Sequence, residues 1–251
     1  MKRKLKKPLL FALASLPAAV IGGWFVLQYQ LDLLPPEAIR QLIEQAGSKA
    51  VLIAVGLIQT AITVTLAAFF GRILAEKLGL WKSFWFDKKQ IQTTVLLSVA
   101  AGILFSADYW TFGAALPEIQ KATEAGMTVW GILASVFYGG VIEELLMRLF
   151  VMSLAGFILW KLFWRKREGV PVAALVTANV LSALLFAAGH LPVTVTAFGA
   201  LTPMLIFSCF LLNGGFGLLF GWLYRKYGIQ YAMVGHALCH MVSKLIWWIA
   251  L

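Results

Sequence analysis

The side chains best able to do chemistry in this sequence are few, and they lie inside or at the ends of long apolar stretches: Glu143, Glu144, Arg148, His190, His236, His240 and Lys244. An ionisable group within a bilayer costs a few kcal/mol or more unless it is paired, so such residues indicate function by default. All three histidines of the chain belong to this set. We interpret Lys244 as structural, because a lysine can extend its charged end toward a lipid headgroup.

The acidic pair predicts two different environments. Glu144 and Arg148 are four residues apart, so on a helix they share a face and can form an ion pair. Glu143 is turned by about 100° from Glu144 on a helix and need not join that pair. One carboxylate would then be held by the arginine while the other faces a cavity, where it could act as a general base.

The histidines allow more than one interpretation. His236 and His240 are four residues apart and therefore project from one helix face, a spacing that allows two imidazoles to bind one metal ion. His190 ends another apolar stretch, where a lone histidine is often interfacial. A buried Glu–Arg pair can equally serve to lock two helices together. From these residues alone, catalysis, metal binding and helix locking are all possible interpretations.

The composition identifies the elements that must position these groups. The chain is 61% hydrophobic and only 13% charged, with a mean hydropathy of +0.86, and several apolar runs exceed the ~20 residues that cross a bilayer as a helix. We predict an all-α, polytopic transmembrane helical bundle of seven to eight membrane segments, forming a single domain over 1–251. Cys209 and Cys239 lie in apolar runs and are interpreted as small hydrophobic residues. Seven spans are predicted, at about 8–29, 49–74, 91–107, 127–160, 170–190, 199–224 and 229–251.

Two of these spans are unusually long. Residues 127–160 as one straight helix would measure ~50 Å, against a hydrocarbon core of ~30 Å. A break or kink is therefore expected at Gly139-Gly140, and another at Asn213-Gly214-Gly215, and a complete break would add the eighth segment. In an unbroken seven-span arrangement, His190 lies near the outer end of its span and His236 about 10 Å in from the inner end. The two would then be too far apart to share a site.

The basic residues predict the orientation. The positive-inside rule places the N-terminus in the cytoplasm and the C-terminus outside, with the first span as a retained signal anchor. The net charge of +10 then reflects topology and anionic headgroups, and it does not indicate nucleic-acid binding. Sixteen of the 21 basic residues fall on the predicted cytoplasmic side: Lys2, Arg3, Lys4, Lys6, Lys7, Arg72, Lys77, Lys82, Lys88, Lys89, Lys161, Arg165, Lys166, Arg167, Arg225 and Lys226.

Three short motifs resemble those of one family. "EELLMR", from Glu143 to Arg148, resembles the EExxxR motif of the CPBP or Abi family of CAAX proteases and bacteriocin-processing membrane proteins. "FAAGH", from Phe186 to His190, is similar to its FxxxH motif. "HALCH", from His236 to His240, lies where the family carries HxxxN. The resemblance covers about 127–250, taken as the catalytic-motif core, with 1–126 as accessory helices.

The resemblance implies an intramembrane endopeptidase of the glutamic type that needs no metal. In that scheme Glu143 and His190 activate a water molecule, while Glu144 and Arg148 orient the base. His236 and His240 donate hydrogen bonds to the oxyanion, and Phe186 shapes the pocket. The departure is His240 in place of asparagine, although an imidazole can also donate a hydrogen bond.

The implied substrate is a peptide or protein at the membrane, either prenylated or an unmodified precursor, and the expected location is a bacterial cytoplasmic membrane. Two alternatives remain. His190, His236 and His240 with a carboxylate could bind zinc in a metalloprotease. A non-catalytic scaffold, immunity or regulatory protein could use the same charges to lock or gate helices.

Overall fold

The computed structural model is helical throughout the part of the chain that it describes, with no strand there. The structure describes the backbone of residues 2–251 and the side chains from Leu5 onward. Met1 and the side chains of Lys2, Arg3 and Lys4, which belong to the predicted basic N-terminal segment, lie outside the described residues. Seven helical segments are long and apolar enough to cross a membrane, as predicted. The protein is therefore an all-α polytopic membrane protein.

The order of elements alternates long spans with short connecting helices. The turns carry ordinary signals: Ser48 and Asp87 accept hydrogen bonds from backbone amides at the starts of α3 and α4, and Gly47 ends α2 with a positive φ. The bounds are α1 Lys2–Leu33, α2 Pro36–Ala46, α3 Lys49–Leu78, α4 Lys88–Ser106, η1 Ala107–Tyr109, α5 Phe112–Ala115, α6 Pro117–Ala125, α7 Val129–Ala134, η2 Ser135–Met152, α8 Ser153–Phe163, α9 Val172–Gly189, α10 Leu191–Phe198, α11 Pro203–Cys209, η3 Phe210–Gly214, α12 Gly215–Tyr227 and α13 Ile229–Ala250.

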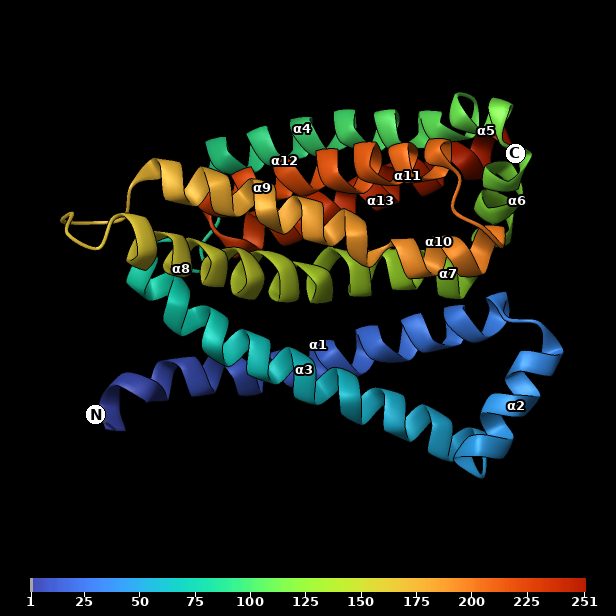
Figure 1. Ribbon diagram of the computed structural model, residues 1–251, viewed down its shortest axis with the longest axis horizontal. Coiled ribbons are helices and arrows are strands. Elements are labelled where there is room, and N and C mark those ends of the chain that lie inside the picture. Colours follow the sequence, from blue (N-terminus) through green and yellow to red (C-terminus); the bar gives the residue numbers. More distant parts are fainter. Residues whose placement is uncertain (1) are drawn as a thin grey trace.

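The bundle has two ends of different charge. One end carries the N-terminus and the α3–α4, α8–α9 and α12–α13 connections, and we call it the basic end (Figure 1). The other end carries α2, α5, α6, the α10–α11 connection and the C-terminus, and we call it the acidic end (Figure 1). Six of the eleven acidic residues lie at the acidic end: Asp32, Glu37, Glu44, Asp108, Glu118 and Glu124.

The two long spans are not broken. The segment from Val129 to Phe163 is one continuous helix of 35 residues, whose middle part, η2, is π-helical. The segment from Pro203 to Tyr227 is also continuous and contains the short π-helical element η3. Neither position is a complete break, so the chain has seven spans and the conditional eighth segment does not form. Because a π-helix closes its hydrogen bonds over five residues, it is wider and shorter than an α-helix with the same number of residues. The π-helical turns therefore fit more residues into the same span.

The glycines expected to break η2 instead allow two helices to touch. A Cβ on Gly140 would lie 2.6 Å from the Cβ of Ala237, and one on Gly139 would lie 3.2 Å from Nε2 of His240. A similar close contact lies at Gly221 of α12, where an added Cβ would collide with the side chain of Asn179. Small residues thus bring η2 against α13 and α12 against α9, which sets the spacing of the site.

Candidate active site

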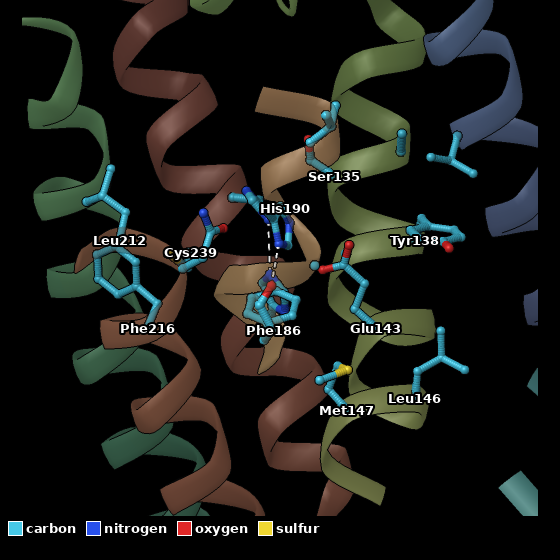
Figure 2. Close-up of a pocket in the computed structure, with 18 of the residues that line it drawn as sticks. Ser135, Tyr138, Glu143, Leu146, Met147, Phe186, His190, Leu212, Phe216 and Cys239 are labelled. Atoms are coloured by element: carbon cyan, nitrogen blue, oxygen red, sulfur yellow. Dashed lines mark hydrogen bonds between the residues drawn. The ribbon is translucent and has the colours of Figure 1, made fainter. Parts of the chain in front are cut away.

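The two glutamates occupy different environments on η2. Glu144 is fully buried, and its Oε1 lies 2.8 Å from Nδ1 of His236 and 3.3 Å from Nη1 of Arg148. Glu143 is only partly buried and lines a cavity of about 520 Å³, where its carboxylate points toward His190 and Phe186 (Figure 2). Within the described residues, Glu143 forms no hydrogen bond or ion pair with another side chain. The predicted division of roles, one carboxylate paired and the other facing a cavity, matches this geometry.

Arg148 is held from several sides. Besides Glu144, its Nη2 donates a hydrogen bond to the carbonyl of Gly217 at 3.2 Å. Its guanidinium lies over the ring of Phe186, with the central carbon 4.6 Å from the ring centroid. Only 1% of Arg148 is exposed. A buried cation with an anion, a carbonyl and an aromatic face around it is compensated, so Arg148 and Glu144 together add little net charge to the site.

The histidines of α13 form a chain with Glu144. Nδ1 of His236 donates to the Glu144 carboxylate, and Nε2 of His236 lies 3.1 Å from Nε2 of His240. A contact between two ring nitrogens requires a single hydrogen, which one imidazole donates and the other accepts. Phe220 stacks on His236 with ring centroids 4.5 Å apart and fixes the plane of that ring. The carboxylate, the two imidazoles and the stacked ring therefore form one ordered unit on the cavity wall.

His190 presents a free nitrogen to the cavity. Its Nδ1 donates to the carbonyl of Phe186 at 2.8 Å, since a carbonyl can only accept. In the neutral ring, Nε2 then carries a lone pair and can accept a proton. The ring also contacts the edge of Phe186, with centroids 4.6 Å apart. Phe186 is buried and touches His190, His236 and Arg148, so it packs the three motifs together as expected for a pocket-shaping residue.

The separation in depth that an unbroken seven-span arrangement would give His190 and His236 is not present. Both line the same cavity as Glu143 and His240. Two features of the fold explain this. The α9–α10 segment continues as one span to Phe198, so His190 lies within the span and not at its end. The hairpin of α8 and α9 also extends farther toward the basic end than α12 and α13 do, so equal positions along these helices are at different depths (Figure 1).

The donors present do not fit a zinc site. Among the described residues, no three His, Cys, Asp or Glu side chains are placed to share one metal ion. Nδ1 of His236 is directed at a carboxylate, and the Nε2 atoms of His236 and His240 face each other, but no third donor among the described residues is placed to complete a set with them. The alternative of a zinc metalloprotease thus lacks its ligand set in this arrangement.

Several cavity residues were not predicted from the sequence. Tyr138 and Ser135 of η2, Asn213 of η3 and Phe220 of α12 all line the cavity. The position of Asn213 could have indicated a site residue, because an amide within an apolar span is unusual. From the sequence, it is interpreted only as part of a helix break. The aromatic residues carried none, since aromatic side chains are frequent throughout these spans.

Comparison with known proteins identifies one family. Residues 125–242 match the family model described as "Type II CAAX prenyl endopeptidase Rce1-like". The matched region contains all three motifs and confirms the resemblance predicted from them. Comparisons with curated proteins and with solved structures find no significant match. The family supports a protease that acts within the membrane.

Proposed function

We propose, from the match of residues 125–242 to the Rce1-like family model and from the geometry of the site, that the protein is an intramembrane endopeptidase of the glutamic type, with Glu143 as its general base. The observation that carries this proposal is the contrast between the two glutamates. Glu144 is fully buried with two partners, whereas Glu143 faces a cavity together with three imidazoles. A pair of acids that served only to lock helices would have no reason to leave one of them unpartnered in such a cavity.

The proposed reaction begins with a water molecule held between Glu143 and Nε2 of His190. As the water oxygen attacks the scissile carbonyl carbon, its proton passes to Glu143 and the carbonyl oxygen becomes an oxyanion. Collapse of the tetrahedral intermediate then breaks the C–N bond, and the proton on Glu143 passes to the leaving amine. Atoms and charge balance without a metal ion or another cofactor.

The oxyanion is stabilised by the hydrogen that His236 and His240 share between their Nε2 atoms. Because Nδ1 of His236 donates to the Glu144 carboxylate, Nε2 of the neutral ring accepts, and the shared hydrogen is carried by Nε2 of His240. A donor already oriented within a site of low dielectric contributes most where charge develops, typically about 10²–10³-fold in rate. His240 thereby takes the role that an asparagine has in the family motif, and Arg148 and Glu144 act as positioning residues.

The substrate is a peptide or protein at the membrane, and the cavity walls agree with an apolar segment. Leu146, Met147, Leu185 and Phe216 line the cavity beside the polar groups. We place the catalytic core in about 127–250 and assign 1–126 to accessory helices. A bacterial cytoplasmic membrane with the N-terminus inside remains the proposed location.

The test compares Glu143→Gln with Glu144→Gln in purified protein reconstituted into liposomes. Quenched fluorescent casein and a farnesylated peptide with a C-terminal CaaX sequence serve as probes. Glu143→Gln should keep its folded amount and melting temperature while losing about 10²–10⁴-fold in cleavage rate. Glu144→Gln leaves the Arg148 charge buried without its partner, so it should lose about 3–5 kcal/mol of stability.

Cleavage that persists in Glu143→Gln would overturn the proposal. Loss of folded protein in both variants would instead assign the pair to helix locking and favour a non-catalytic protein.

A further inference from the structure

The cavity has a defined position along the bundle. The cavity extends from the middle of the bundle toward the acidic end, and in α13 its lining residues His236, Cys239 and His240 lie near the middle of the helix. In α1 the lining begins at Val26, seven residues before the helix ends at Leu33, and in α4 it consists of Phe105, one residue before the helix ends. In the helix from Val129 to Phe163, which runs in the opposite direction, the lining stops at Met147.

A second cavity continues the first toward the acidic end. It has a volume of about 290 Å³ and shares Ser135, Asn213 and His240 with the first cavity. Its other walls include Ala122 on α6, the short helix that covers the acidic end, and the polar side chains Asp108 and Lys244. A polar passage therefore leads from His240 to the surface helices of the acidic end.

Toward the basic end, the bundle is closed. Leu149, Met152 and Tyr224 lie beyond the cavity and are fully buried, and the hydroxyl of Tyr224 is 2.8 Å from Oγ of Ser153. The connection between α3 and α4 is also tied down, because Nε2 of Gln230 donates to the carbonyls of Ser83 and Trp85. Packed side chains and these bonds close the basic end, whereas the second cavity reaches the surface helices of the acidic end.

The charges indicate which side of the membrane each end faces. The basic end carries Lys82, Lys88 and Lys89 around the α3–α4 connection, the exposed run Arg165–Arg167, and Arg225 with Lys226 at the end of α12. The acidic end carries Arg40, Lys49 and Lys121, which are outnumbered by its six acidic side chains. Short loops rich in lysine and arginine stay in the cytoplasm. The closed end is thus the cytoplasmic one.

We propose that the site opens to the side of the membrane away from the cytoplasm, so that its substrates are polypeptides that have already crossed the membrane. This inference rests on the proposed peptidase function and names its substrate class. A prenylated tail that stays in the cytoplasm would meet the closed end of the bundle. The reaction that supplies the substrate is therefore translocation or membrane insertion, which must precede cleavage.

The test is cysteine labelling with a membrane-impermeant maleimide in the full-length chain. Cys209 and Cys239, both buried, are first replaced by alanine, and the resulting cysteine-free chain serves as the control for background labelling. Single cysteines then report on three places: Lys121→Cys on the exposed surface of α6, Glu168→Cys in the exposed α8–α9 connection, and Ser135→Cys at the junction of the two cavities.

In intact cells, Lys121→Cys and Ser135→Cys should react and Glu168→Cys should not. In inverted membrane vesicles, Glu168→Cys should react and the other two should not. Reaction of Glu168→Cys in intact cells overturns the orientation. Failure of Ser135→Cys to react from the side that labels Lys121→Cys overturns the open acidic end. Each variant is scored only on protein that elutes as a single folded species.

Labelling does not depend on catalysis, so the two proposals fail separately. A reversed labelling pattern with an inactive Glu143→Gln variant would leave the peptidase in place and move its substrates to the cytoplasm. The expected pattern with a fully active Glu143→Gln variant would leave the orientation in place and remove the proposed catalytic role of Glu143.

Discussion

The contact between Gly140 and Ala237 sets the distance between the proposed base and the imidazoles. An added Cβ on Gly140 would lie 2.6 Å from the Cβ of Ala237 and 2.9 Å from its Cα. Carbon atoms pack best at about 3.5–4.0 Å, so in Gly140→Ala η2 and α13 must separate by about 1 Å. Ala237 follows His236 directly, and the separation therefore moves His236 and His240 away from Glu143.

A displacement of this size has a large effect on rate. A misplacement of about 1 Å can cost ~10²-fold, so we expect Gly140→Ala to lose about that factor in kcat. Overpacking should also lower stability by about 1–3 kcal/mol. The helix propensity of alanine exceeds that of glycine by about 1 kcal/mol and offsets part of this loss.

The assay measures kcat on the quenched peptides and the melting temperature of the same preparation. The matched control is Gly215→Ala, because a Cβ on Gly215 meets nothing within 4 Å. The control gains the same helix propensity and should keep the rate. A Gly140→Ala enzyme with the rate of the parent protein would refute the idea that this contact positions the site, and so would an equal loss in the control.

Three further expectations concern the polar groups of the site. Arg148→Met leaves the buried Glu144 carboxylate with only its histidine partner and should lower stability by about 3–5 kcal/mol, measured by thermal melting; an unchanged melting temperature would contradict the buried ion pair. His240→Asn retains an N–H donor and should keep most of the rate, whereas His240→Leu should lose about 10²–10³-fold; similar rates for both would remove His240 from oxyanion stabilisation. A chelator such as 1,10-phenanthroline should leave cleavage unchanged, and activity lost with chelator and restored by zinc would restore the metalloprotease alternative.

The fold was predictable from the sequence because membrane spans depend mainly on composition and length. The seven spans and the Glu144–Arg148 pair follow from apolar runs and from a four-residue spacing. Both signals are local, so they can be recognised in the sequence without knowledge of the tertiary arrangement.

The π-helical turns and the depth of the site could not be predicted. Hydropathy gives the length of a span but not its hydrogen-bond register, so the length of the helix through Glu143 was explained by a break at Gly139-Gly140. Those glycines are there for close contact with α13. The offset of one helix along another is likewise set by packing. Hydropathy alone therefore could not show that His190 and His236 lie at the same depth.

The cavity has a wall that the family region does not supply. Val26, Tyr29, Gln30 and Leu33 belong to α1, outside residues 125–242, yet they line the same space as Glu143. The proposed reactive groups and this part of the cavity wall therefore belong to different parts of the polypeptide. Exchanging the first helix would alter which peptides fit while leaving the reactive groups untouched, and a fragment lacking it would expose those groups to hydrocarbon.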